Sequence, residues 1–226
     1  MRQNTFKINP IRNRNAFTML ELVFVVVVLG ILAAMAIPRL DQDIKQEAAD
    51  SILSDIRYTQ HLALNDDKHS FSNPNWQRAF WRIGFNNCSG GTGIFEYIGS
   101  DDNMNGGTLA NKEAATDPAN GKKMIWSTGS TCSDGGDAAT SDRIFLSHKF
   151  GINNISYSGC GNNNQYIGFD HLGRPHSGFA GSTVPNYGSY LTTTCTITFN
   201  MDNGDDFNIT IQPETGYAQI GGQPDS

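Results

Sequence analysis

The clearest feature of the hydropathy pattern is an apolar run from Phe17 to Ile37, which follows a polar and basic segment. The run contains 21 residues, and its only charged residue is Glu21. A helix of this length spans roughly 32 Å, about the thickness of the hydrocarbon core of a membrane. The pattern therefore predicts a membrane-spanning helix over residues 17–37.

Beyond Pro38 the pattern becomes amphipathic and stays so to about Asp66. Apolar residues recur there at the spacing of one helix face: Ile44, Ala48, Ile52, Ile56 and Ala63. Charged residues are expected to cover the opposite side: Asp43, Lys45, Asp50, Asp55 and Arg57. We therefore predict one long helix over residues 17–66, whose second half packs its apolar face on a sheet.

The remainder of the chain has the pattern of short strands separated by Gly, Asn and Asp. Strands are predicted at residues 79–85, 94–98, 123–127, 143–146, 152–157, 166–170, 192–200, 207–212 and 217–220. Asn203-Gly204 lies between two of these runs and predicts a hairpin turn. The fold class is therefore α+β, with a long N-terminal helix packed on antiparallel sheets and a β-rich domain over residues 67–226.

Charge fixes the expected orientation of the chain. Residues 1–16 contain four basic residues and no acid, so they should remain cytoplasmic and direct the C-terminal domain across the membrane. The whole chain has a formal charge of −6, and without residues 1–16 it keeps 12 Lys and Arg against 22 Asp and Glu, a charge of −10. This acidity argues against general nucleic-acid binding.

Four cysteines are present: Cys88, Cys132, Cys160 and Cys195. They form no C-x-x-C pair and have no His at zinc-ligand spacing, so a zinc site is not expected. An even number in a domain that faces an oxidising compartment predicts two disulfides. Three pairings are open, of which Cys88–Cys132 and Cys160–Cys195 are favoured because each joins neighbouring segments.

Glu21 is the anomaly of the apolar run. A carboxylate in a membrane-spanning helix is costly and requires a partner, but the run contains no Lys or Arg. If the chain were cut between Ala16 and Phe17, the new ammonium group of Phe17 would lie one helical turn from Glu21, in the same chain or in a packed neighbour.

Around this point the sequence resembles the type IV prepilin family, which includes the pseudopilins of type II secretion. The family has a short basic leader, a small residue before the cut, Phe after it and Glu at mature position five. Here these are Ala16, Phe17 and Glu21. The family usually has Gly before the cut, so Ala16 is a departure. An ordinary signal peptide cut after Ala36, at Ala34-Met35-Ala36, and a plain signal anchor are the alternatives.

A second resemblance lies near the C-terminus. Gly168-Phe169-Asp170 with Gly173-Arg174-Pro175, and Ile209-Thr210-Ile211 followed by Thr215-Gly216-Tyr217, resemble the GspH/FimT group of minor pseudopilins. Residues 70–160 resemble no family that we can name.

Together these resemblances imply a minor pseudopilin, a structural subunit of a periplasmic pseudopilus and not an enzyme. Prepilin peptidase would cut off the leader, residues 1–16, and Phe17 would be N-methylated. The implied location is the inner membrane, crossed once, with the C-terminal domain in the periplasm. The implied partners are other pseudopilins or pilins, the peptidase, the inner-membrane assembly platform and membrane lipid. The alternative is a minor type IV pilin that acts in pilus assembly or DNA uptake, as FimT-like proteins do.

The remaining candidate sites are weak. Asp101, Asn103 and Asn105 before Gly106 resemble the front half of a calcium loop, but Lys112 stands where a bidentate Glu is required, and Glu113 comes one residue late. No cofactor is expected apart from this calcium candidate. His171 and His176 flank Arg174 in an expected solvent-facing turn without a third ligand, and Arg174 is free to bind a nearby carbonyl or carboxylate. Core packing is expected for three tryptophans: Trp76, Trp81 and Trp126.

Overall fold

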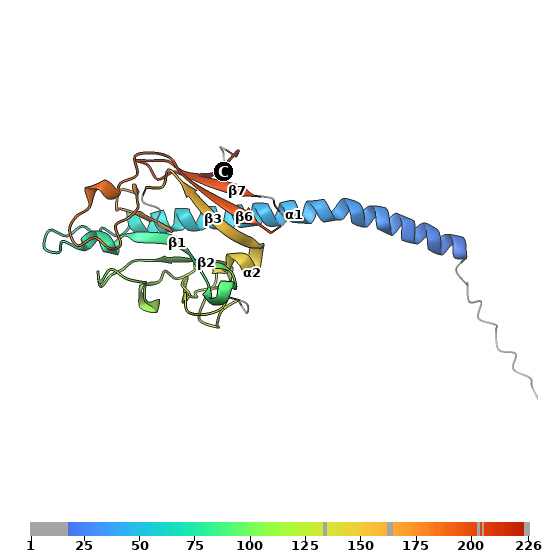
Figure 1. The fold of residues 1–226 in the computed structure, drawn as a ribbon, viewed down its shortest axis with the longest axis horizontal. Helices are drawn as coiled ribbons and strands as arrows, with labels where there is room; N and C mark the ends of the chain where they lie inside the picture. Colours follow the sequence, from blue (N-terminus) through green and yellow to red (C-terminus); the bar gives the residue numbers. More distant parts are fainter. Residues whose placement is uncertain (1–17, 133–134, 162–164, 203, 205, 224–226) are drawn as a thin grey trace, which may run out of the picture. The chain divides into compact units, whose positions relative to one another are not determined.

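The computed structural model describes residues 18–132, 135–161, 165–202, 204 and 206–223, with side chains throughout except at residues 34–43. The long helix α1 begins at Met19 and ends at Leu64. The chain divides into two compact units, Met1–Leu40 and Asp41–Ser226. The second unit holds the C-terminal part of α1 and all of the described strands (Figure 1).

The second unit contains two antiparallel four-stranded sheets. The first sheet has the order β2-β1-β4-β5, with β1 at Trp81–Asn87, β2 at Ile94–Gly99, β4 at Tyr166–Phe169 and β5 at Pro175–His176. The second has the order β3-β6-β7-β8, with β3 at Ile152–Ser158, β6 at Cys195–Met201, β7 at Phe207–Ile211 and β8 at Ala218–Ile220. A short helix, α2 (Leu146–Phe150), precedes β3.

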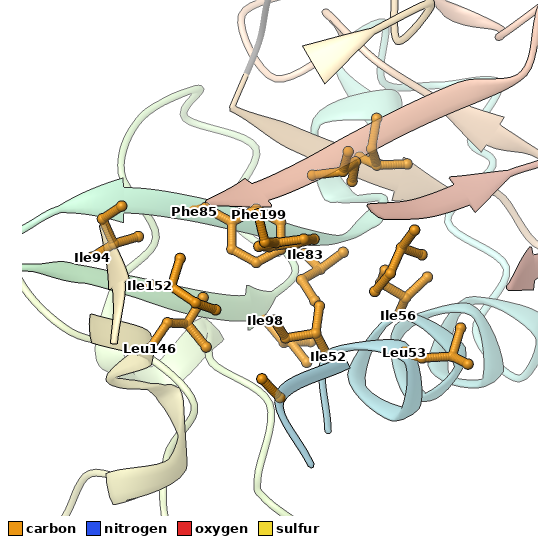
Figure 2. Close-up of a cluster of buried hydrophobic side chains, with 14 of the residues drawn as sticks. Ile52, Leu53, Ile56, Ile83, Phe85, Ile94, Ile98, Leu146, Ile152 and Phe199 are labelled. Carbon is orange, nitrogen blue, oxygen red and sulfur yellow. The ribbon is translucent and has the colours of Figure 1, made fainter. Parts of the chain in front are cut away.

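The core lies where the C-terminal part of α1 meets both sheets. Ile52 and Ile56 of α1 are fully buried, and they point toward Ile83 of β1 and Ile98 of β2 (Figure 2). Phe199 of β6 enters the same cluster from the second sheet and contacts Phe85 edge to face. Side chains one helical turn apart share a face, so the 3.6-residue period of the sequence places this apolar stripe on the sheets.

The predicted α+β class, an N-terminal helix followed by antiparallel sheets, is confirmed. In β6 and β7 buried and half-buried residues alternate, as the sequence pattern indicates for strands with one face in the core. The two strands pair from Cys195 with Ile211 to Phe199 with Phe207, as a hairpin requires. Two residues of the connecting turn, 203 and 205, lie outside the described part of the chain.

Two of the predicted strands are wrong. Residues 142–144 form a 3₁₀ turn, and at residues 123–127 only isolated bridges form. Met124 receives a hydrogen bond from the Ile98 amide (2.9 Å) and donates its own amide to Ala115 (3.0 Å). Because its two bonds go to different segments, no continuous ladder with one neighbour can develop.

Candidate functional site

The start of α1 carries the acid that the sequence analysis singled out. The amide of Glu21 donates to Oγ1 of Thr18 (3.2 Å), and the Leu22 amide donates to the carbonyl of Thr18 (3.1 Å). Thr18 is thus the N-cap, and Glu21 occupies the third helical position, where the positive end of the helix dipole favours a carboxylate. This role of Thr18 was not predicted from the sequence, although Thr-x-x-Glu is a known capping pattern. Ala16 and Phe17 lie outside the described residues.

The helix after Glu21 presents its apolar side chains without cover. The large apolar residues from Met19 to Leu32 are between 36% and 86% exposed. A continuous apolar surface of this kind is typical of a site that contacts lipid or another protein. Within the residues that can be assessed, we find no helix that is both long and apolar enough to cross a membrane.

The turn after β4 differs from the sequence prediction. His176 does not face solvent: it is 6% exposed, and its ring nitrogens lie 2.9 Å from Oγ of Ser189 and 3.3 Å from Oδ2 of Asp170. Asp170 also accepts hydrogen bonds from Nε of Arg174 (2.8 Å) and from its amide (2.9 Å). Burial opposes ionisation, but the hydrogen bonds from His176 and Arg174 outweigh it and hold the pKa of Asp170 well below its usual value.

This group fixes a turn and does not form a metal site. Arg174 binds the carboxylate of Asp170, one of the two kinds of partner expected from the sequence. His171 is not part of this group, and its Nδ1 lies 3.3 Å from Asp67. No cluster of three or more His, Cys, Asp or Glu able to hold a metal occurs among the described residues. Asp170 was not predicted as the partner of His176, because the two residues meet only when β4 pairs with β5.

The calcium candidate is an internally bonded turn. Asp101 is fully buried, and its two oxygens accept the amides of Asn105 (3.2 Å) and Gly106 (2.8 Å). The side-chain oxygen of Asn103 accepts the Asn105 amide (3.1 Å), and its Nδ2 donates to Glu113. Asp101 and Asn103 thus hold this turn together through its own backbone amides, and calcium binding at Asp101, Asn103 and Asn105 stays a prediction.

The cysteines form two disulfides, Cys88–Cys132 and Cys160–Cys195. The second joins strands that are already paired, since Ser158 of β3 lies opposite Thr196 of β6. The first joins the end of β1 to a loop segment without strand structure. Of the three pairings that the sequence left open, the structure contains the one that links neighbouring segments.

The tryptophans lie in or at the edge of packed clusters. Trp76 is 8% exposed and contacts Phe80 edge to face at 5.3 Å. Trp81 donates to Asp66 (2.8 Å), and Trp126 donates to the carbonyl of Thr131 (3.2 Å) while it packs on Phe145.

A buried ionic cluster lies between α1 and the first sheet. Asp55, which was expected on the solvent side of α1, is 1% exposed and forms an ion pair with Arg143. Glu96 of β2 is fully buried beside Asp55, and Asp117 contacts Arg143 at 3.4 Å. The assignment of Asp55 to the exposed side is wrong because loop residues 117 and 143 cover that part of the helix.

Comparison with known proteins bears on the N-terminal segment alone. Residues 11–37 match the family model of the prokaryotic N-terminal methylation motif. No curated protein and no solved structure matches the chain. The motif implies processing by prepilin peptidase and assembly with other pilins, and it indicates membrane anchoring and a structural role. It therefore identifies residues 11–37 as the signal of a type IV pilin-like or pseudopilin precursor.

Proposed function

We propose that this protein is a minor pseudopilin of a type II secretion system. Prepilin peptidase cuts between Ala16 and Phe17, and the new amine of Phe17 is methylated. The apolar part of α1 anchors the protein in the inner membrane and then packs among other pseudopilins on the assembly platform. The unit from Asp41 onward faces the periplasm and carries no catalytic function.

The observation that carries this proposal is the methylation motif at residues 11–37, which includes the exposed apolar helix surface from Met19 to Leu32. Glu21 is the only charged residue in the sequence between Thr18 and Ile37. Two disulfides in the second unit agree with a domain that matures in an oxidising compartment.

Glu21 supplies the physical basis for assembly. The methylated ammonium of Phe17 would enter an apolar bundle of helices, where an unpaired charge costs several kcal/mol. The carboxylate of Glu21, in the same subunit or in a neighbour, provides the compensating charge. Helix packing then requires correct register, because the two charges must meet.

The alternative role in DNA uptake has less support. FimT-like proteins that capture DNA carry arginines near the C-terminus, whereas residues 215–223 contain no Lys or Arg. Without cations, binding would lack the release of counterions that dominates affinity for DNA.

Glu21→Ala tests the proposal in a cell that produces the peptidase and the partner pseudopilins. We expect normal cleavage after Ala16 but at least about tenfold less protein in sheared filaments, since a tenfold loss corresponds to only about 1.4 kcal/mol. Immunoblots of membrane and filament fractions, with mass spectrometry of the mature N-terminus, provide the measurement.

Glu47→Ala is the matched control because it also removes a carboxylate from α1, at a side chain that is 63% exposed. This variant should assemble like the wild type. The pairing argument is wrong if Glu21→Ala assembles normally or accumulates as uncut precursor. Absence of any cleavage of the wild-type chain between Ala16 and Phe17 would overturn the proposed function itself.

A further inference from the structure

The outer face of the first sheet carries a cavity that the proposed assembly role does not use. The cavity has a volume of about 220 Å³. Its wall includes three aromatic side chains, one guanidinium and two small or aliphatic residues: Tyr97, Trp126, Tyr166, Arg82, Leu109 and Ala180. It lies entirely within the second unit.

Three glycines of the first sheet make room for bulky side chains in and around the cavity wall. Gly84 of β1 lies opposite Tyr97 of β2 and Tyr166 of β4, and a Cβ atom at Gly84 would overlap the Tyr97 ring. Two residues before Gly84 on the same face of β1, Arg82 lies opposite Gly99 and Gly168. A Cβ atom at Gly99 would come within 2.7 Å of Leu109, and one at Gly168 would overlap Phe179. The missing side chains thus let Tyr97, Leu109 and Phe179 lie against the sheet around Arg82.

Arg82 brings an uncompensated charge into this wall. It is 3% exposed, and its Nη2 donates to the carbonyl of Gly107 (3.2 Å). Its Nε and Nη1 have no hydrogen-bond acceptor within the described parts of the chain. The guanidinium lies 5.5 Å from the centre of the Tyr166 ring, a cation–π contact that provides no acceptor for Nε or Nη1.

Two other arginines of the second unit have partners for more of their N–H groups. The half-buried Arg143 is paired with Asp55 and Asp117, and the buried Arg78 donates to three backbone carbonyls. A buried charge without a counterion is costly, and a protein usually pairs or neutralises it. A guanidinium is too basic to lose its proton, so an external anion is the remaining source of compensation.

We propose that this cavity binds a carboxylate carried on an aromatic or apolar group. The carboxylate would accept hydrogen bonds from Arg82 in the planar, two-pronged geometry that guanidinium favours, after a small displacement of the Tyr166 ring. The apolar part would lie between Trp126 and Tyr97. The volume suits a single ring, which a free aromatic acid or the C-terminal residue of a protein can supply.

The test uses the full-length chain in dodecyl maltoside micelles and 4-fluorobenzoate as the probe, observed by ¹⁹F NMR. We expect saturable binding with a dissociation constant of about 1 mM or tighter, and at least about tenfold weaker binding of the neutral 4-fluorobenzamide. A short peptide that ends in phenylalanine is then added as a competitor of 4-fluorobenzoate, and the same peptide with a C-terminal amide is the control. This competition distinguishes a protein C-terminus from a free aromatic acid as the natural ligand. Displacement by the free-acid peptide indicates a protein C-terminus, and no displacement indicates a small free acid.

Arg82→Met should weaken 4-fluorobenzoate binding at least about tenfold, and Arg82→Lys should restore it in part, since Lys keeps the charge without the planar fork. Lys112→Met removes a cation from an exposed residue outside the cavity wall and should bind like the wild type. If Arg82→Met does not fold, the wild type remains decisive: its melting temperature should rise with 4-fluorobenzoate and not with 4-fluorobenzamide. Equal binding of acid and amide, unchanged affinity in folded Arg82→Met, or no saturable binding would overturn the proposal.

Discussion

At the scale of single residues, Glu96 of β2 is a carboxyl group shielded from water. It is fully buried, and desolvation, together with the charge of Asp55, raises its pKa well above the usual value. Neither of its oxygens has a hydrogen-bond donor among the described residues, and neither does Oδ2 of Asp55. Two carboxylates can bond to each other only when one carries a proton, so the raised pKa of Glu96 is consistent with a protonated Glu96 that donates to Asp55.

This arrangement predicts a dependence of stability on pH. Because the pKa of Glu96 is higher in the folded state than its ordinary value of 4.5, the unfolded chain releases this proton first as the pH rises. The contribution of Glu96 to stability is therefore fully present below pH 4.5 and is lost as the pH rises through the folded pKa. Burial also raises the pKa of Asp55, which acts in the same direction.

Glu96→Gln should remove most of this loss, because the amide stays neutral and can still donate to Asp55. We expect the variant to be more stable than the wild type at pH 8, by about 1.4 kcal/mol for each pKa unit of the shift that it removes. Urea unfolding at several values between pH 5 and pH 8 measures the effect. Glu47→Gln, at an exposed acid, should leave the wild-type profile unchanged, and parallel profiles for Glu96→Gln and wild type would contradict this account.

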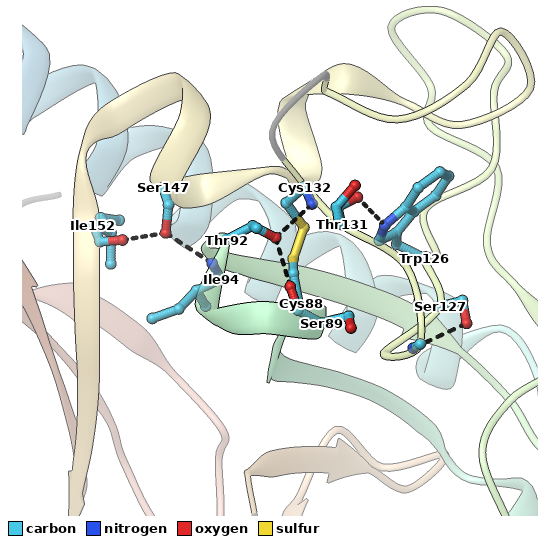
Figure 3. The surroundings of a disulfide bond; sticks show 11 residues. Cys88, Ser89, Thr92, Ile94, Trp126, Ser127, Thr131, Cys132, Ser147 and Ile152 are labelled. Carbon is cyan, nitrogen blue, oxygen red and sulfur yellow. Dashed lines mark hydrogen bonds between the residues drawn. A yellow bond between two sulfur atoms is a disulfide. The ribbon is translucent and has the colours of Figure 1, made fainter.

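At the scale of elements, a disulfide and hydrogen bonds link residues 88–92, which follow β1, to the loop segment 127–132. The amide of Cys132 donates to Thr92 (2.9 Å), and the amide of Ser89 donates to Ser130 (2.9 Å), as Figure 3 shows in part. Nearby, Ser147 of α2 accepts the amide of Ile94 (2.7 Å) and donates to Ile152, which joins the starts of β2 and β3. Strand ladders are absent from residues 127–132, so the Cys88–Cys132 bond and the hydrogen bonds to Ser89 and Thr92 connect that segment to residues 88–92.

Replacing Cys88 and Cys132 together by Ala should lower the free energy of unfolding by about 3–4 kcal/mol, since the bond closes a span of 44 residues in the unfolded chain. Amide exchange should also become faster at residues 127–132. Urea unfolding and hydrogen exchange with mass spectrometry provide the measurements.

The matched control is Cys160→Ala with Cys195→Ala, which removes a bond across a similar span of 35 residues. The loss in the free energy of unfolding should be similar. Amide exchange at residues 127–132 should not change, because this bond lies at β3 and β6, which remain paired. Equal local exchange in the two double variants would show that the first disulfide does not hold the loop.

At the scale of the whole molecule, the net charge determines whether the chain attracts or repels DNA. Without residues 1–16 the formal charge is −10, and repulsion of phosphate outweighs local contacts with a few cations. We therefore expect the processed protein to show no salt-sensitive retention of duplex DNA in gel-shift assays at micromolar concentration. A protein that binds DNA strongly serves as the positive control in the same gels, and retention that weakens steeply with salt would support the uptake alternative.

The sequence alone determined the features that depend on local periodicity. The helix, the strands with strict alternation such as β6 and β7, and the α+β class follow from which residues recur on one face, a property of neighbours in the chain. The methylation motif is likewise a continuous pattern, and comparison with known proteins detects it at residues 11–37.

Only the tertiary structure decided which polar residues are buried and what they meet. Asp55 has the sequence position of a solvent-facing residue, but Arg143 and Asp117 approach it from loops far along the chain. His176 gains Asp170 through the pairing of β4 with β5, and Arg82 enters a cavity wall because glycines on two neighbouring strands leave room for other side chains. Burial and partners depend on contacts between distant segments, so no local pattern in the sequence records them.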